Sequence, residues 1–80
     1  MNKTNDEKYI NRIIMLGLNI SYYRKFRGYA QEEFADIVGI SRVHLSKIEA
    51  PNMNSTLSVR TLFDIADALN IEPGKLLEER

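Results

Sequence analysis

The chain has 80 residues, of which eleven are Lys or Arg, eleven are Asp or Glu and none is Cys. A chain of this length forms one domain with one small hydrophobic core, and without cysteine it has neither a disulfide framework nor a thiolate metal site. Its longest apolar run, residues 13–16, is far shorter than a membrane span, and its first eight residues are too polar for a secretory signal peptide. We therefore expect a cytoplasmic protein with no membrane association.

Positive and negative charges are unevenly distributed along the chain. Residues 1–30 carry six Lys or Arg and two acids, a net charge of +4, whereas residues 31–80 carry five and nine, a net charge of −4. A total of zero argues against nucleic-acid binding, because proteins that bind nucleic acids tend to be basic. Glu32 and Glu33, however, fall in the expected first turn of a helix, where the helix dipole favours acids. The charge therefore weakens a nucleic-acid-binding function without excluding it.

Residues 1–5 are predicted to be a disordered tail, and a single domain is predicted over residues 6–80. Apolar residues at steps of three and four predict a first helix from about residue 6 to residue 27. Its first half carries additional apolar surface, formed by Tyr9, Ile10, Ile13 and Ile14. These residues either pack on the core of a longer helix or contact a second copy of the chain, because a small domain has little core to cover them.

Two short helices are predicted next, over about residues 31–38 and 41–50. Five apolar residues at helical spacing face inward: Phe34, Ala35, Val38, Leu45 and Ile48. Between the helices, Gly39 suits a turn that requires a positive φ angle. Ser41 can accept a hydrogen bond from a free amide at the start of the second helix. This stretch therefore predicts a helix, a tight turn and a second helix.

The second of these helices also has an outward face. At about 100° per residue, Val43, Ser46, Lys47 and Ala50 point away from Leu45 and Ile48, with Arg42 at the edge. Two cations, a hydroxyl and an apolar side chain on a small anchored helix are suited to reading bases in the DNA major groove. Taken alone, the two cations are better explained as a solvated helix face.

The remaining sequence predicts two further helices. A polar loop follows Ala50, and Ser58 is placed to cap a helix that ends at Asn70. Pro73 suits the first turn of a short last helix. The chain is therefore predicted to be an all-α, five-helix domain.

This pattern resembles the phage repressor and Cro-type (XRE-like) helix-turn-helix transcriptional regulators. The matching residues of the motif are Gln31, Phe34, Ala35, Val38, Gly39, Ile40, Leu45 and Ile48, and the resemblance extends over roughly residues 16–77. Ala30 departs from the family, which usually has Ser or Thr at this position as a cap of the first motif helix. The Ser-Arg-x-x-Leu-Ser-x-Ile-Glu pattern is also similar to restriction–modification controller proteins, and small phage repressors and antitoxins fit nearly as well.

The resemblance implies roles for specific residues. Arg42, Val43 and Lys47 are expected to contact bases, Arg42 by pairing with guanine and Val43 by meeting a thymine methyl group. Contacts to the DNA backbone are expected from Gln31, Ser41, His44, Ser46, Asn52 and Arg60. Some of these have simpler alternatives: Gln31 as an exposed side chain, Ser41 as a cap, and His44 as a residue packing at the flank.

The same resemblance implies a structural ion pair between Arg24 and Glu49, which would tie the first helix to the end of the second motif helix. The tyrosines at positions 9, 22, 23 and 29 are more simply explained by core packing than by base stacking.

The sequence therefore predicts a transcriptional regulator that binds double-stranded DNA at a roughly palindromic site as a homodimer. The alternative is a protein-interaction module that keeps this fold with little or no DNA binding. With one histidine, no cysteine and no phosphate-cradling glycine loop, we expect no enzyme activity. We likewise expect no cofactor, metal or small-molecule ligand.

Overall fold

A computed structural model describes residues 3–52 and 56–79, which form five helices and no strand. The helices are α1 (Lys3–Phe26), α2 (Gln31–Val38), α3 (Arg42–Glu49), α4 (Val59–Leu69) and α5 (Pro73–Leu76). The prediction of an all-α fold is thereby confirmed. None of the described helices combines the length and apolar character needed to cross a membrane.

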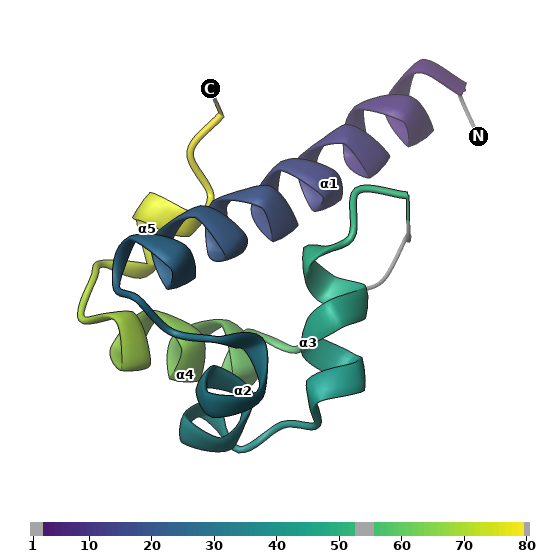
Figure 1. The fold of residues 1–80 in the computed structure, drawn as a ribbon. Helices are drawn as coiled ribbons and strands as arrows, with labels where there is room; N and C mark the ends of the chain where they lie inside the picture. Colours follow the sequence, from purple (N-terminus) through teal and green to yellow (C-terminus); the bar gives the residue numbers. More distant parts are fainter. Residues whose placement is uncertain (1–2, 53–55, 80) are drawn as a thin grey trace.

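All five helices contribute to one hydrophobic core. Its buried members are Leu16, Ile20, Phe34, Ala35, Leu45, Ile48, Ile65, Ala66, Leu69 and Leu76. Figure 1 shows α1 lying along one edge, with α2 and α4 beneath its C-terminal half and α3 standing beside them. Helix α1 contacts α3, α4 and α5, while α2 contacts α3 and α4. The short helices are therefore held by shared burial, since isolated helices of eight residues are marginal in water.

The first half of α1 extends beyond this core (Figure 1). Helix α1 begins at Lys3, so residues 3–5 are helical and the prediction of a disordered tail is wrong for them. Residues 1 and 2 lie outside the described residues. No proline or glycine interrupts the chain before Gly17, so a helix nucleated on the core can propagate toward the N-terminus.

The apolar residues in this first half of α1 are not core residues. Tyr9 is 59% exposed and Ile10 is 37% exposed, while Ile13 and Ile14 are half-buried. Packing on the chain's own core is therefore the wrong interpretation for Tyr9 and Ile10. The helical period correctly indicates one apolar side, but this part of α1 runs past the elements that would cover it.

Helix α1 approaches α3 closely at Gly17. A Cβ atom at this position would clash with the backbone carbonyl oxygen of Ile48, near the end of α3. Glycine thus allows the two backbones to meet, because it has no side chain to separate them. This contact fixes the position of the C-terminal end of α3 relative to α1.

Candidate nucleic-acid interface

The turn between α2 and α3 is closed by backbone and side-chain hydrogen bonds. The N–H groups of Gly39 and Ile40 donate to the carbonyl oxygen of Ala35 at 2.8 and 3.0 Å, and Gly39 has a φ angle of 89°. Ser41 Oγ then accepts a hydrogen bond from the N–H of His44 at 3.0 Å. The glycine ends α2 and the serine begins α3, so the direction of α3 is set locally.

Helix α3 has one buried side and one exposed side. Leu45 and Ile48 belong to the core, whereas Arg42, Val43 and Lys47 are exposed, Val43 by 55%. The structure therefore brings the three expected base-contacting residues onto the accessible side of one helix. Anchoring by Leu45 and Ile48 holds this side in place, so its side chains can meet a rigid surface without reordering the backbone.

Two of the residues expected to contact the DNA backbone lie on the flanks of α3. Ser46 and His44 are half-buried. Ser41 is exposed, and its hydroxyl oxygen is engaged as the cap of α3. A hydroxyl that accepts one hydrogen bond still has its own hydrogen to donate, so capping leaves Ser41 able to donate to a phosphate oxygen.

Asn52 lies in the segment that joins α3 to α4, and Arg60 lies in the first turn of α4. Both are exposed. Arg60 Nε is 4.0 Å from Asp64 Oδ2, and its side chain is 92% exposed. An ion pair this long and this exposed contributes little energy, so Arg60 can exchange Asp64 for another anion at little cost.

The N-terminus of α2 presents free backbone donors. The first helical hydrogen bond runs from the N–H of Phe34 to the carbonyl of Ala30, and no side chain caps this end. The N–H groups of the preceding three residues therefore have no partner within the helix. The Gln31 side chain is half-buried, and its Nε2 donates to Glu49 Oε1 at 3.0 Å. Its second amide hydrogen remains available to an anion near the uncapped end.

A buried ion pair supports this end of the motif. Arg24 donates to Glu49 twice, from Nε to Oε2 at 2.7 Å and from a terminal nitrogen to Oε1 at 3.0 Å. The other terminal nitrogen of Arg24 donates to the carbonyl oxygen of Tyr29 at 2.6 Å. With Gln31 included, the network joins α1, the following turn, α2 and α3. In the described part of the chain, every fully buried side-chain nitrogen or oxygen has a hydrogen-bond partner.

Sequence reasoning missed one buried polar residue, Asn19 on α1. Its side chain is 1% exposed, and its Nδ2 donates to the carbonyl oxygens of Leu76 and Glu78 at 3.0 and 2.7 Å. The signal was present, because Asn19 lies next to Ile20 on the inward side of the helix, where a polar side chain needs a partner. The identity of that partner, 57 residues away, is not a local property.

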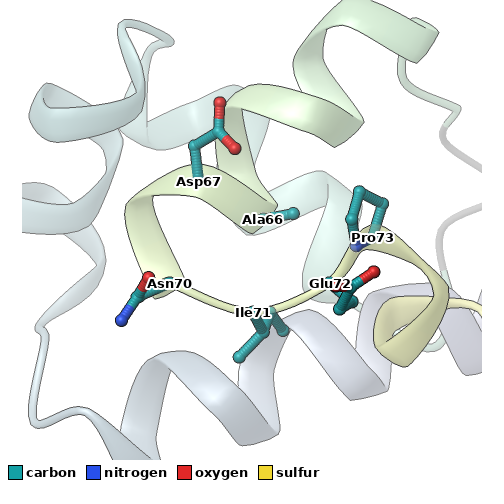
Figure 2. Close-up of a pocket in the computed structure, with 6 residues that line it drawn as sticks. All are labelled: Ala66, Asp67, Asn70, Ile71, Glu72 and Pro73. Atoms are coloured by element: carbon teal, nitrogen blue, oxygen red, sulfur yellow. The ribbon is translucent and has the colours of Figure 1, made fainter.

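Two further features lie outside the interface. A hollow of about 430 Å³ lies around the connection between α4 and α5. Figure 2 shows the residues that line it, Ala66, Asp67, Asn70, Ile71, Glu72 and Pro73. None of the residues expected to contact DNA lines it. Among the described residues, no three His, Cys, Asp or Glu side chains are grouped as metal ligands would be.

A model of the helix-turn-helix family matches residues 20–76, which include α2, α3 and the core around them. The chain belongs to this helix-turn-helix family, of the XRE type. The match begins at Ile20, so the exposed first half of α1 lies outside the part that defines the family.

Two curated regulators are similar to this helix-turn-helix protein. The transcriptional regulator SinR of Bacillus subtilis is 33% identical over 66 residues, which are 82% of this chain and 59% of SinR. The control protein C.SmaI of Serratia marcescens is 38% identical over 63 residues, which are 79% of this chain and 73% of C.SmaI. The chain thus matches less than two thirds of the length of SinR.

Solved structures of helix-turn-helix proteins share this fold. The restriction–modification controller protein C.AhdI from Aeromonas hydrophila superposes with a TM-score of 0.74 at 26% identity, covering 80% of this chain and 94% of that one. SinR in complex with DNA superposes with a TM-score of 0.72 at 32% identity, covering 79% and 98%.

Proposed function

We propose that this protein is a transcriptional regulator of the cytoplasm that binds double-stranded DNA sequence-specifically as a homodimer. The observation that carries this proposal is the exposed side of α3, where Arg42, Val43 and Lys47 stand on a helix anchored in the core by Leu45 and Ile48. The similarity to SinR in its DNA complex supports it. Relatives that are regulators or control proteins favour DNA binding over catalysis.

The three exposed residues of α3 supply different kinds of base recognition. Arg42 lies in the first turn, the end of a recognition helix that enters the groove most deeply. Its guanidinium can donate to O6 and N7 of one guanine, which discriminates by about 1–3 kcal/mol. Val43 offers an apolar contact for a thymine methyl group, and Lys47, one turn further, reaches a base or a phosphate.

Contacts to phosphates orient α3 in the groove. The free N–H groups at the start of α2, with Gln31 beside them, form one anion site. Further contacts come from five residues around α3 and the start of α4: Ser41, His44, Ser46, Asn52 and Arg60. These contacts are local, so a net charge of zero for the whole chain does not prevent them.

The homodimer places two recognition helices on the two halves of a roughly palindromic site. The first half of α1 supports dimerisation, because it carries exposed Tyr9 and Ile10 beside half-buried Ile13 and Ile14. Apolar side chains that a small domain leaves uncovered favour contact with another molecule. Two copies also double the number of phosphate contacts.

A binding-site selection from random duplex DNA, followed by fluorescence anisotropy over a salt series, tests this function. We expect one preferred site whose affinity falls steeply as salt rises, because bound phosphates release counterions. The Arg42→Ala variant should lose about 1–3 kcal/mol of its preference for that site over a scrambled duplex. The matched control is Lys75→Ala, which removes an exposed cation of α5. A selection that enriches no sequence would instead support the protein-interaction module.

A further inference from the structure

The outer side of α1 carries a row of apolar side chains spaced by four residues: Ile10, Ile14, Leu18, Tyr22 and Phe26. Leu18, Tyr22 and Phe26 are 42%, 48% and 72% exposed. The rings of Tyr22 and Phe26 stack with their centroids 6.3 Å apart, so this end of the row forms a continuous surface. We call these five residues the outer α1 row. Rows of this spacing are the ridges that interlock when two helices pack together.

We infer that the outer α1 row binds the same row of a second copy of this chain, with the two α1 helices antiparallel. This inference rests on the homodimer of the proposed function and assigns its interface. The row is symmetric about Leu18, so in an antiparallel pair Leu18 meets its own counterpart. Ile14 then lies near Tyr22 of the other copy, whereas Ile10 and Phe26, each about 80° around the helix from Leu18, lie at the margins of the contact. The side chains at the centre of the contact, Ile14, Leu18 and the ring of Tyr22, are apolar in both copies, as burial requires.

Charges near the two ends of the row suit the antiparallel alignment. Glu7 lies three residues before Ile10, Lys25 lies three residues after Tyr22, and both are exposed. In an antiparallel pair, Glu7 of one copy lies about 6 Å along the axis from Lys25 of the other. A parallel pair would instead place each charge beside its own kind, which is unfavourable. The charge pattern thus selects one of the two alignments.

The position of α3 on α1 makes this dimer compatible with DNA binding. Gly17, where α1 contacts α3, is one residue and therefore about 100° around the helix from Leu18. The axes of the two antiparallel α1 helices lie roughly in one plane, and the two-fold axis that relates the copies is perpendicular to this plane. Rotation about that axis keeps each copy of α3 on the same side of the plane. Both copies of α3 consequently lie on one side of the dimer, as a palindromic site requires.

This interface differs from the group Tyr9, Ile10, Ile13 and Ile14 that the sequence indicated. Ile10 and Ile14 belong to both sets: Ile14 lies about 40° around the helix from Leu18, and Ile10, at about 80°, lies near the boundary between the outer and inward sides of α1. Tyr9 and Ile13, by contrast, lie at the same angle around the helix as the buried Leu16 and Ile20. The inferred interface therefore lies around α1 from the expected group and is centred on Leu18.

Analytical ultracentrifugation of the full chain over a concentration series tests the inference. We expect reversible association to twice the monomer mass of 9.2 kDa. Leu18→Glu should weaken this association about tenfold or more, because it places two like charges at the centre of an apolar contact. Phe63→Glu is the matched control, since Phe63 is a similarly exposed residue of α4, at 50%. Circular dichroism melting of both variants verifies that they fold.

A cysteine cross-link gives a second, independent measurement. The chain contains no cysteine, so Leu18→Cys introduces a single thiol at the position that meets its own counterpart. A disulfide requires Cα atoms about 4.4–6.8 Å apart, a distance that two packed helices reach at their point of contact. Under mild oxidation Leu18→Cys should form a covalent dimer efficiently, and Phe63→Cys should not.

A chain that stays monomeric at every concentration, or one whose dimer survives Leu18→Glu and is lost in Phe63→Glu, would overturn this interface. The DNA-binding measurement is separate, so the two failures can be distinguished. Specific DNA binding with an unaffected Leu18→Glu dimer would refute the interface and keep the proposed function. A dimer that is lost in Leu18→Glu, in a protein that selects no DNA sequence, would support the interface and refute the proposed function.

Discussion

Arg24 Nε lies 2.7 Å from Glu49 Oε2, and the two side chains are 7% and 5% exposed. This buried pair joins α1 to the last residue of α3 and also holds Gln31 at the start of α2. Charges taken out of water are expensive unless each is paired and hydrogen-bonded. The network satisfies this condition, and it lies behind the recognition helix rather than on its exposed side.

Removing one partner of this pair should destabilise the fold. We expect Glu49→Ala to lower the free energy of unfolding by about 3–5 kcal/mol, because Arg24 is then left as an uncompensated buried charge. Urea denaturation measures the loss. Asp36→Ala, which removes an exposed acid of α2, is the control and should change stability by less than about 0.5 kcal/mol. A Glu49→Ala variant as stable as the parent protein would show that the pair has no structural role.

The close approach of α1 and α3 should be sensitive to a single methyl group. Gly17→Ala forces the new Cβ against the carbonyl oxygen of Ile48, and we expect a loss of about 1–3 kcal/mol as the helices separate. Gly74→Ala adds the same methyl group where no atom lies within 4 Å. Thermal unfolding should therefore show a lower melting temperature for Gly17→Ala and little change for Gly74→Ala. Equal melting temperatures for the two variants would contradict this explanation.

Supplying the missing cap of α2 should stabilise the protein. Ala30 has extended backbone angles, φ −72° and ψ 157°, close to those of the capping residues Ser41 and Ser58. We expect Ala30→Ser to add about 1 kcal/mol, because its hydroxyl can accept a hydrogen bond from a free N–H of the first turn. Ser58→Ala, measured in parallel, should lose a similar amount. No gain in Ala30→Ser alongside a clear loss in Ser58→Ala would indicate that local geometry prevents capping at position 30.

The salt dependence of DNA binding should identify a phosphate contact made by Lys47. If this side chain neutralises one phosphate, Lys47→Ala lowers the slope of log affinity against log salt by about 0.9. The change in affinity should then be similar for all duplexes. Lys75→Ala, on α5, should leave the slope unchanged. A loss confined to the preferred sequence, with the slope intact, would assign Lys47 to a base instead.

Sequence reasoning predicted the local features of this fold well. Leu45 and Ile48 define the inward side of α3 by their spacing, and Ser41 caps the same helix with its own side chain, so neither depends on distant residues. The Arg24–Glu49 pair was expected from resemblance alone, because nothing in the spacing of two residues 25 apart indicates contact. Whether another element buries the apolar side of a helix likewise depends on residues that are distant in the sequence. Periodicity therefore identified the apolar side that holds Tyr9 but not whether another element packs over it.

The hydrogen bonds of Asn19 constrain the order in which the fold can form. They connect α1 to backbone carbonyls 57 and 59 residues further along the chain. During synthesis, the chain must leave the ribosome at least as far as Glu78 before both bonds can form. Closing a loop of this length costs more conformational entropy than forming a contact between residues close in the sequence. The hydrogen bonds of Asn19 therefore form late in folding, when the C-terminal segment docks on α1.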